Sequence, residues 1–364
     1  MSFREFLGNE ATVRYLRESI AADRLPHALI LAGPRGAGKY TLAVMLAQTV
    51  NCLDPKITDG LPDYCGVCAN CVRIGQSIDL DARVDEAIAA REELREVDKK
   101  ETRILIQTHP DVLVIPPDPP QLLIKLGQVR TLVREIYRMP AEAKRAFYIF
   151  TSAAFMKEAA NSLLKVLEEP PAHACIILLA ENLGDLLPTI RSRGCIFRLG
   201  AVPVEQIEKL LAERRAELRP AQRALVARLA QGAVGEALGF DLEAYQASRA
   251  DALLILRNAV QEPDFSALFR MTETYRAGAE GQEKTADMLG AMLSVLEDLL
   301  LLQAGTPKLV RNVDLEKELA AMAGQVDLDW IGEAERGVHR VRTGMRRNLL
   351  RSLSLDAFAT DLVR

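Results

Sequence analysis

The sequence has few of the features that mark membrane proteins, secreted proteins or proteins that bind nucleic acid by bulk charge. Aromatic residues make up only 5% of the 364 residues, which argues against a surface that stacks on unpaired bases. The net charge of −4 argues against a protein that binds DNA by bulk positive charge. No apolar run approaches the roughly 18–20 residues of a membrane-spanning helix, and no apolar signal segment follows Met1. We therefore expect a cytoplasmic protein with reduced cysteines.

The sequence is organised around residues 28–41, Ala-Leu-Ile-Leu-Ala-Gly-Pro-Arg-Gly-Ala-Gly-Lys-Tyr-Thr. The apolar run 28–32 predicts a buried strand, and an apolar-periodic helix follows the loop. A strand, a glycine-rich turn and a helix start are the elements of a phosphate-binding P-loop. In such a loop, backbone N–H groups, the helix dipole and a lysine ammonium all face an anion. The candidate nucleotide-binding residues are Gly33, Gly36, Gly38 and Lys39.

The loop lacks the hydroxyl residue that normally follows its lysine and holds magnesium. Tyr40 stands there, and its phenol oxygen lies several bonds beyond the place of a serine Oγ. Thr41 is no simple substitute, because one residue along a helix lies about 100° further around it. We expect no ATP hydrolysis at this loop and leave open whether it binds ATP. The alternative is a tight strand-to-helix turn that binds nothing.

Strands and helices alternate through the first 200 residues. Apolar runs predict strands at 111–115, 146–150, 175–180 and 195–199, and apolar periodicity predicts helices at 127–138 and 155–168. This alternation predicts a doubly wound parallel α/β sheet with right-handed connections. A P-loop ATPase carries an acid after a strand such as 146–150 to hold magnesium. Here no Asp or Glu stands between Glu142 and Glu158, so the second magnesium-binding element is also missing.

Four cysteines follow the P-loop helix, and the last three have the spacing C-x2-C-x2-C. They are Cys52, Cys65, Cys68 and Cys71. Four thiolates can surround zinc tetrahedrally and close a structural site, so this segment predicts structural zinc. An iron–sulfur cluster is the alternative metal centre, since its ligands are also thiolates. Cys175 and Cys195 lie in predicted strands, and we expect both in the core.

Residues 76–108 contain neither glycine nor proline and are dense in charges of both signs. This pattern predicts a solvated helix or helical hairpin that projects from its domain. Beyond residue 200 the sequence predicts helices throughout, with the first two at 203–218 and 220–231. Two apolar stripes mark the C-terminal part: Met292, Leu296, Leu299 and Leu300, and then Leu349, Leu353, Phe358 and Leu362.

Several stretches together resemble one family. They are Leu25-Pro26-His27-Ala28, the four cysteines, His109-Pro110-Asp111, Asn161-Ser-Leu-Leu-Lys-Val-Leu-Glu-Glu-Pro-Pro171 and Leu187-Pro-Thr-Ile-Arg-Ser-Arg193. The chain resembles the clamp-loader subunits of bacterial DNA polymerase III, which are AAA+ proteins, and among them those of the delta-prime type. The family's Ser-Arg-Cys element appears as Ser192-Arg193-Gly194, with the cysteine one place later. Only Arg193 is carried over from that element, as a residue that acts in trans on a neighbouring subunit's ATP.

The resemblance implies three domains. An AAA+ P-loop domain would span 1–200, with a zinc module at 52–71 and a helical insertion at 76–108. A small helical lid would follow at 201–245, and a helical collar for oligomerisation at 246–364. In ATP-hydrolysing relatives the lid places an arginine near the position of Gly235, and glycine has no side chain for that role.

The resemblance also implies a function within the DNA-directed DNA polymerase holoenzyme. The chain would be a non-hydrolysing subunit that gives an arginine finger to a neighbour while a sliding clamp is loaded onto primed DNA. Its partners would be the gamma/tau and delta subunits in a hetero-pentameric ring, the sliding clamp and, through the complex, primer-template DNA. Two alternatives stay open: an ATP-hydrolysing subunit of the gamma/tau type, and a zinc-containing P-loop nucleotide-binding protein outside replication.

Overall fold

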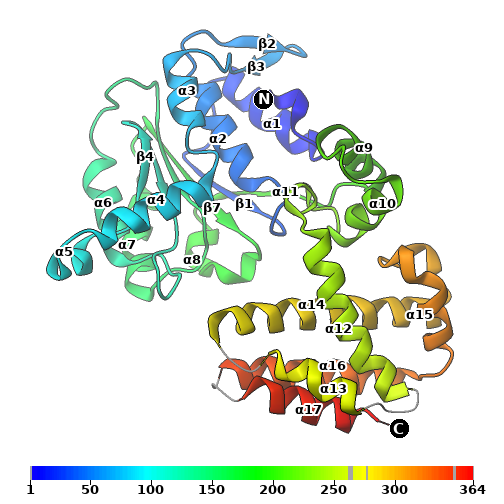
Figure 1. The fold of residues 1–364 in the computed structure, drawn as a ribbon. Helices are drawn as coiled ribbons and strands as arrows, with labels where there is room; N and C mark the ends of the chain where they lie inside the picture. Colours follow the sequence, from blue (N-terminus) through cyan, green and yellow to red (C-terminus); the bar gives the residue numbers. More distant parts are fainter. Residues whose placement is uncertain (1, 261–264, 276–277, 347–349, 364) are drawn as a thin grey trace. The chain divides into compact units, whose positions relative to one another are not determined.

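The computed structural model describes residues 2–260, 265–275, 278–346 and 350–363 (Figure 1). It contains two compact units. Unit 1 consists of residues 1–206 and 232–236, and unit 2 of residues 207–231 and 237–364. Helices α9 (Val204–Arg214) and α11 (Val234–Gly239) each cross from one unit into the other. The division into P-loop, lid and collar domains stays a prediction.

Unit 1 is built on one sheet with the strand order β4-β5-β6-β7-β1-β8 among the described residues. Its strands are β1 (Ala28–Ala32), β4 (Ile106–His109), β5 (Val112–Ile115), β6 (Ala146–Phe150), β7 (Ala174–Ala180) and β8 (Cys195–Arg198). β1 lies between β7 and β8, parallel to both. The P-loop therefore leaves the sheet from an interior strand, which agrees with the buried strand predicted at 28–32.

The prediction of an all-parallel sheet is wrong at one edge. β4 pairs with β5 antiparallel, with a register shift between Ile106 and His109. Only two residues separate these strands, a connection that allows an antiparallel pair but is too short for a parallel crossover. β4 falls partly inside the predicted insertion 76–108, so that segment is not helical throughout.

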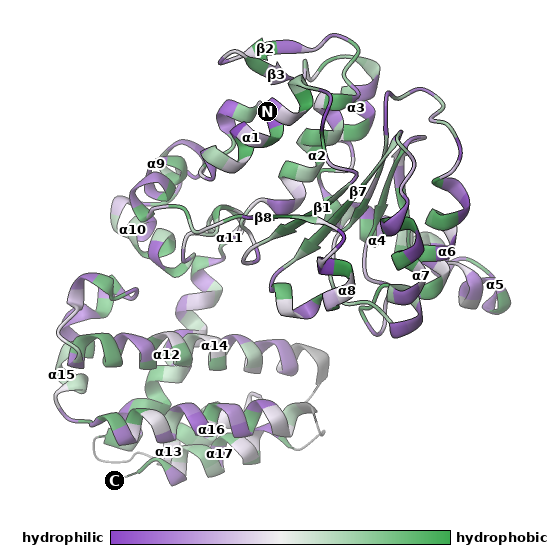
Figure 2. Cartoon of the chain, turned by 180° about the vertical axis from the view of Figure 1, so that it is seen from behind, coloured by the Kyte–Doolittle hydropathy of each residue, from purple (hydrophilic) through white to green (hydrophobic). Residues whose placement is uncertain are grey.

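Helices cover both faces of the sheet, which makes it doubly wound. Along each strand the side chains alternate: Leu29 and Leu31 pack toward α2 (Lys39–Val50), whereas Ile30 belongs to the core under α7. α1 (Glu10–Ala21) lies on the α2 side, and α6 (Leu126–Glu135) and α7 (Lys157–Glu168) cover the other face. In Figure 2 the central strands are coloured as hydrophobic, consistent with their burial on both faces.

Of the two cysteines in strands, one is buried as predicted and the other is not. Cys175, in β7, is fully buried as expected, and burial raises the pKa of its thiol to about 12. Cys195 is exposed, so its placement in the core is wrong. Its strand, β8, is an edge strand paired only with β1 among the described residues, and most of β8 is exposed.

The charged segment after the cysteines forms two helices, α4 (Leu80–Glu92) and α5 (Glu96–Glu101). No residue of α4 is buried, which agrees with a solvated helix. Its C-terminal end is tied to Asp118, whose fully buried carboxylate accepts a hydrogen bond of 2.5 Å from Arg91. Lys125 lies 3.5 Å from the same carboxylate, so one buried acid joins the insertion to the loop after β5.

Unit 2 is helical in its described residues. Its helices are α10 (Pro220–Leu229), α12 (Leu242–Val260), α13 (Phe265–Glu273), α14 (Gly278–Gln303), α15 (Glu316–Ala323), α16 (Leu328–Arg346) and α17 (Arg351–Asp361). The short 3-10 helices are η1 (Phe3–Glu5) and η2 (Leu183–Asp185) in unit 1, and η3 (Pro307–Leu309) and η4 (Val313–Leu315) in unit 2. α14 runs beside α12, α15 and α16 in one hydrophobic core.

The two apolar stripes belong mostly to that core. Buried members are Met292, Leu296, Leu299, Phe358 and Leu362; Leu300 and Leu353 are exposed, and Leu349 lies outside the described residues. The stripes thus stabilise unit 2 itself. Of their described members, only the exposed Leu300 and Leu353 could contact another subunit in the predicted collar. No described helix is long and apolar enough to cross a bilayer.

The acid of His109-Pro110-Asp111 fixes the loop that leads into β6. The Asp111 carboxylate accepts hydrogen bonds from the backbone N–H groups of Ala141, Glu142 and Ala143 at 2.7–2.8 Å. The His109 ring is buried, and its Nδ1 accepts the N–H of Asp111 at 3.1 Å. This motif therefore orders a loop at the amino ends of β5 and β6, the edge of the sheet opposite the P-loop.

We predict that Asp111→Ala destabilises this loop by about 1–2 kcal/mol, because three N–H groups lose a charged acceptor. Hydrogen exchange of residues 141–147 should then be about 10-fold faster. Fluorescence is a poor probe here, since the single tryptophan, Trp330, lies in unit 2. The control is Asp185→Ala, which removes an acceptor from one exposed N–H, that of Asn182. Equal exchange in both variants would contradict the assignment.

Candidate functional site

The P-loop has the predicted strand–turn–helix geometry. β1 ends at Ala32 and α2 begins at Lys39. Gly36 and Gly38 have φ values of 70° and 81°, which residues with a Cβ rarely adopt. Gly38 is the N-cap of α2, and its carbonyl accepts the N–H of Leu42 at 2.9 Å. Residues 33–39 thus form the kind of turn that binds phosphate in nucleotide-binding proteins.

The Lys39 ammonium is bound to the loop itself. Its Nζ donates to the carbonyl oxygens of Gly33 at 2.6 Å and Pro34 at 2.7 Å. Partial burial lowers the pKa of Lys39, and the Glu181 carboxylate acts in the opposite direction. Two of the three N–H donors of the ammonium thus have acceptors within the turn.

A segment from far along the chain covers the turn. The N–H of Gly235 donates to the carbonyl of Gly36 at 2.8 Å, and Arg35 pairs with Glu236 at 3.1 Å. A Cβ added to Gly36 would lie 2.7 Å from the backbone nitrogen of Glu236. A Cβ on Gly235 would lie 3.1 Å from the Gly36 Cα. Residues 232–236 therefore press against the P-loop so closely that an arginine at 235 would need the backbone to shift.

Tyr40 is a structural tie instead of a metal ligand. Its hydroxyl donates to the carbonyl of Ser77 at 2.6 Å, and Ser77 is almost fully buried. Burial raises the pKa of Tyr40 to about 12, so the phenol stays protonated at neutral pH. The side chain thus joins the start of the P-loop helix to the segment that precedes α4.

The end of β6 offers no carboxylate, as the sequence indicates. Thr151 follows the strand and donates its N–H to Ile115 at 3.1 Å. The Ser152 hydroxyl accepts the N–H of Ala154 at 3.1 Å, so it closes a local turn. Neither of the two positions that hold magnesium in P-loop ATPases therefore carries a residue suited to it.

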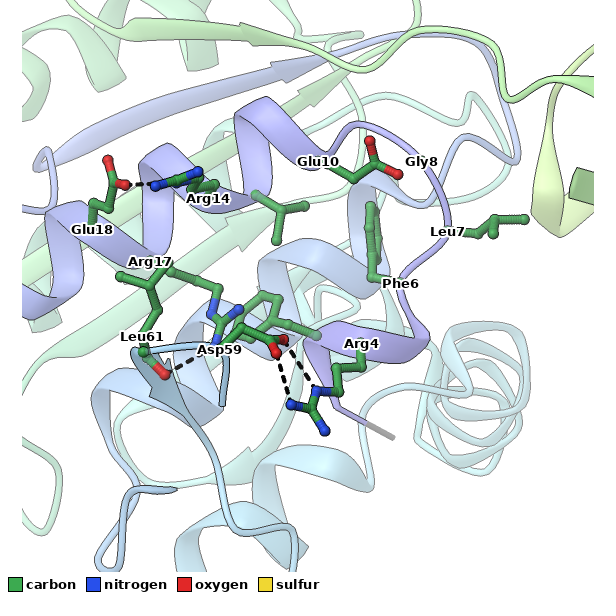
Figure 3. A pocket seen from close by; sticks show the side chains of 13 residues that line it. Arg4, Phe6, Leu7, Gly8, Glu10, Arg14, Arg17, Glu18, Asp59 and Leu61 are labelled. Atoms are coloured by element: carbon green, nitrogen blue, oxygen red, sulfur yellow. Dashed lines mark hydrogen bonds and ion pairs between the residues drawn. The ribbon is translucent and has the colours of Figure 1, made fainter. Parts of the chain in front are cut away.

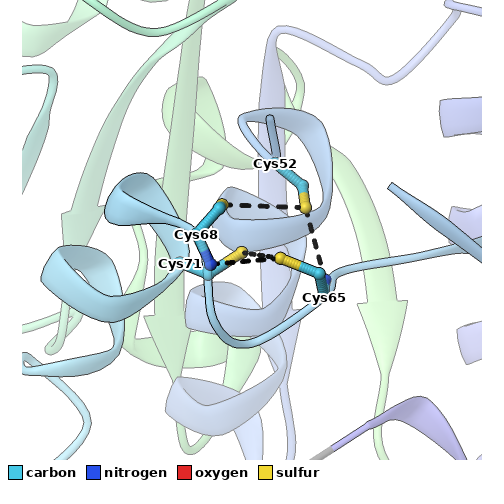
Figure 4. A group of neighbouring side chains, drawn as sticks. All are labelled: Cys52, Cys65, Cys68 and Cys71. Carbon is cyan, nitrogen blue, oxygen red and sulfur yellow. Dashed lines mark hydrogen bonds between the residues drawn. The ribbon is translucent and has the colours of Figure 1, made fainter. Parts of the chain in front are cut away.

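The structure brings all four predicted cysteines together (Figure 4). Their Sγ atoms all lie within 4.8 Å of one another, and the pairs Cys52–Cys68 and Cys65–Cys71 are each 4.0 Å apart. A tetrahedral zinc site with metal–sulfur bonds of about 2.3 Å has sulfur–sulfur edges of about 3.8 Å. The sulfur atoms thus already have the spacing of a metal-binding set.

Local backbone structure holds the cysteines in place. The N–H of Cys65 donates to the Cys52 Sγ at 3.3 Å, and that of Cys68 to the Cys65 Sγ at 3.2 Å. Gly66 turns the chain with a φ of 77°. The module is completed by the hairpin β2 (Lys56–Thr58) and β3 (Leu61–Asp63) and by α3 (Ala69–Gly75), elements that periodicity did not predict.

Burial and hydrogen bonds shift the pKa values of two of the thiols, Cys68 and Cys71, in opposite directions. Burial acts to raise the pKa of Cys68, but the N–H groups of Cys71 and Leu53 outweigh it and lower the value to about 6. Burial raises the pKa of Cys71. N–H groups that stabilise a thiolate also favour a metal-bound sulfur, so the donor set fits a thiolate-binding metal.

Arg193 lies on the surface between α8 (Pro188–Arg191) and β8. Its Nε and Nη2 donate to the Glu168 Oε1 at 3.1 and 2.6 Å, and its Nη1 donates to the Thr189 carbonyl at 2.8 Å. The side chain remains 31% exposed. The structure thus places this arginine apart from the chain's own P-loop motif, on a different segment, and fixes its side chain.

A cavity of about 650 Å³ lies between the N-terminal segment, α1 and the β2–β3 hairpin (Figure 3). Arg4 pairs with Asp59 at 2.7 Å, and Arg14 with Glu18 at 2.9 Å. Arg17 donates to the Pro62 carbonyl at 3.0 Å. These arginines bind the protein itself, so the cavity carries no assignment to a ligand.

Sequence reasoning missed Glu236, Ser77 and Glu168, the partners of Arg35, Tyr40 and Arg193. Each lies at least 25 residues along the chain from its partner. Glu168 and Ser77 stood in stretches singled out by the sequence, 161–171 and 76–108, but nothing in those stretches indicated their partners. Long-range pairing of this kind has no local signal, because it depends on how the elements pack.

Comparison with known proteins assigns the family. A family model described as DNA polymerase III, delta subunit, matches residues 8–203, just over half of the chain. The chain therefore belongs to this family of DNA polymerase III clamp-loader subunits.

Individual relatives agree with this assignment. The chain is 27% identical to the DNA polymerase III subunit delta' of Bacillus subtilis over 316 residues, 86% of this chain and 83% of that protein. It is 30% identical to the subunit tau of Escherichia coli over 242 residues, 65% of this chain and 32% of that protein. The chain thus spans about a third of the tau subunits that it matches.

Among solved structures, a DNA polymerase III gamma subunit-related protein from Thermotoga maritima aligns over 96% of this chain and 98% of its own. The identity is 16% and the TM-score is 0.34, too low to carry an argument. The family assignment therefore depends on the sequence comparisons.

We predict that Tyr40→Phe lowers the free energy of unfolding of unit 1 by about 1–2 kcal/mol, because the buried Ser77 carbonyl loses its donor. Hydrogen exchange at residues 76–80 reports the change locally. The control is Tyr15→Phe, since the Tyr15 side chain is 55% exposed and its loss of a hydroxyl should cost little. A Tyr40→Phe variant as protected as wild type would show that the hydroxyl does not tie these segments together.

Proposed function

We propose that the chain is a clamp-loader subunit of the delta-prime type, which binds no ATP in a productive way and supplies Arg193 to a neighbouring subunit's ATP. The observation that carries the proposal is the packing of Gly235 and Glu236 on the P-loop. The Gly235 N–H donates to the Gly36 carbonyl at 2.8 Å, and a Cβ on Gly36 would lie 2.7 Å from the Glu236 backbone nitrogen. Together with Tyr40 and the acid-free end of β6, this packing favours a subunit that acts in ATP hydrolysis through a neighbour.

The match to the Bacillus subtilis delta' subunit supports this type, because it extends over most of both chains. The match to tau favours the alternative of an ATP-hydrolysing gamma/tau-type subunit. Against that alternative stand Tyr40, the acid-free end of β6 and the missing arginine at 235. Family membership argues against a P-loop protein outside replication.

The partners follow from the proposal. The chain would occupy one position in a hetero-pentameric ring with gamma/tau and delta subunits. The ring would bind the sliding clamp and primer-template DNA, and the net charge of −4 leaves most DNA contact to other subunits. The chain would therefore form part of the polymerase holoenzyme without hydrolysing ATP itself.

We further propose that Cys52, Cys65, Cys68 and Cys71 hold one structural zinc ion. Four sulfur ligands leave no open coordination position, so the metal would fold residues 52–71 and take no part in a reaction. A reduced cytoplasm favours a metal over disulfides at this cluster.

The zinc proposal predicts about one zinc per chain in purified protein, measured by elemental analysis. The double variant Cys65→Ala and Cys68→Ala should lose the metal, and proteolysis should then cut within 52–71. Cys195→Ser is the control, because that exposed cysteine lies outside the cluster and should leave the zinc content unchanged. Protein with iron in place of zinc would support the cluster alternative, and protein with neither metal would refute a metal site.

The isolated chain should show no steady-state ATP turnover. Tyr40→Ser restores a hydroxyl next to Lys39, but we expect it to remain inactive because β6 still lacks its carboxylate. The measurement is phosphate release at saturating ATP and magnesium. Turnover that disappears in Lys39→Ala would show that this loop is a working ATPase.

In a reconstituted clamp loader, Arg193→Ala should leave assembly and zinc content intact. An arginine finger contributes about 10³–10⁵ in rate at its site, so we expect clamp loading to slow by at least about 10-fold. The ATPase activity of the complex, stimulated by clamp and DNA, should fall by the fraction that this one ATP site contributes. Arg191→Ala, two residues away, is the matched control for loss of charge. Clamp loading at the wild-type rate in Arg193→Ala would refute the proposal.

A further inference from the structure

The side chain of Arg193 is held by a carboxylate from another element. Glu168 is the last residue of α7, and Arg193 follows α8. The Glu168 Oε1 accepts from the Arg193 Nε at 3.1 Å and from Nη2 at 2.6 Å. A single carboxylate oxygen thus accepts two hydrogen bonds, both from the Nε and Nη2 edge of the guanidinium.

The other side of the guanidinium is tied to the local backbone. Nη1 donates to the Thr189 carbonyl at 2.8 Å and lies 3.3 Å from the Ser192 Oγ. A guanidinium has five N–H donors. Among the described residues, Nη2 has one acceptor, the Glu168 Oε1, so its second N–H is available. The fixed group therefore still presents a donor to an incoming anion.

The electrostatics of the helix end favour this arrangement. The C-terminal end of α7 carries a partial negative charge, and Glu168 adds a full one at the same place. A carboxylate at a helix C-terminus is unfavourable by itself, so a cation is needed nearby. Arg193 supplies that cation, and the Glu168 carboxylate at the helix end fixes the position of the guanidinium.

We propose that Glu168 is the positioning residue for Arg193. It fixes the guanidinium before a neighbouring subunit's triphosphate approaches, so that less side-chain freedom is lost when the phosphate is bound. This inference rests on the proposed role of Arg193 in trans. A long arginine side chain loses rotamer freedom when it binds a phosphate, and ordering it in advance removes part of that cost from the reaction.

The test uses the reconstituted clamp loader and compares Glu168→Ala, Glu168→Gln, Arg193→Ala and the double variant. We expect Glu168→Ala to lower the stimulated kcat by roughly three- to tenfold with little change in the KM for ATP, since misplacement by about 1 Å can cost up to about 100-fold. Glu168→Gln keeps an acceptor oxygen and should retain part of the rate. Glu169→Ala is the matched control, because Glu169 follows on the chain and makes no ion pair among the described residues.

The double variant separates positioning from a structural effect. If Glu168 acts through Arg193, adding Glu168→Ala to Arg193→Ala changes nothing further. If Glu168→Ala lowers the rate as much in that background as in wild type, the proposal is wrong. In the isolated chain, the Arg193 Nε–H proton should exchange slowly by NMR and rapidly in Glu168→Ala; rapid exchange in both would also refute it.

The remaining outcomes distinguish this inference from the proposed function. If Arg193→Ala slows the complex but Glu168→Ala equals wild type, Glu168 does not position the arginine, and the role of Arg193 stands. If Arg193→Ala itself has no effect, the proposed function fails, and this inference fails with it.

Discussion

The packing of Gly235 and Glu236 on the P-loop is the constraint on which the account depends. The N–H of Gly235 donates to the Gly36 carbonyl at 2.8 Å, and a Cβ on Gly36 would lie 2.7 Å from the Glu236 backbone nitrogen. An arginine at 235 would therefore need the backbone to shift. The turn is thus held from outside by a segment that lies nearly 200 residues further along the chain.

The two positions that hold magnesium in P-loop ATPases have other uses in this chain. Tyr40 ties the P-loop helix to Ser77, and the segment after β6 closes a turn through Ser152. These hydrogen bonds stabilise the fold and bind no metal, which fits a subunit that acts on a neighbour's ATP through a surface residue. Arg193 is the residue there that we place at a neighbour's triphosphate, and Glu168 gives it a defined direction.

Much of the fold of unit 1 follows from its sequence, because buried parallel strands appear as continuous apolar runs. The runs at 28–32 and 146–150 are strands β1 and β6 with those bounds. β4 was missed because its sequence, Ile-Gln-Thr-His, has no such run and its partner lies on one side only. Cys195 was misplaced for the related reason that an edge strand does not bury its side chains.

In the candidate site, too, the local features were predicted from the sequence and the long-range contacts were not. Motif spacing predicted the P-loop turn and the meeting of four cysteines, because both are short and their geometry is local. The contacts of Glu236 and Glu168 could not be predicted, because they join distant segments and depend on how helices pack. The sequence also does not identify the metal in the cysteine cluster, because zinc and iron–sulfur clusters share thiolate ligands.

The most direct test is the structure of the reconstituted clamp loader with an ATP analogue that mimics the transition state of hydrolysis. The account predicts no nucleotide with magnesium at Lys39. It also predicts the Arg193 guanidinium within hydrogen-bonding distance of the terminal phosphate held by the neighbouring subunit. A nucleotide with magnesium at Lys39, or an Arg193 side chain that faces no phosphate, would contradict the account.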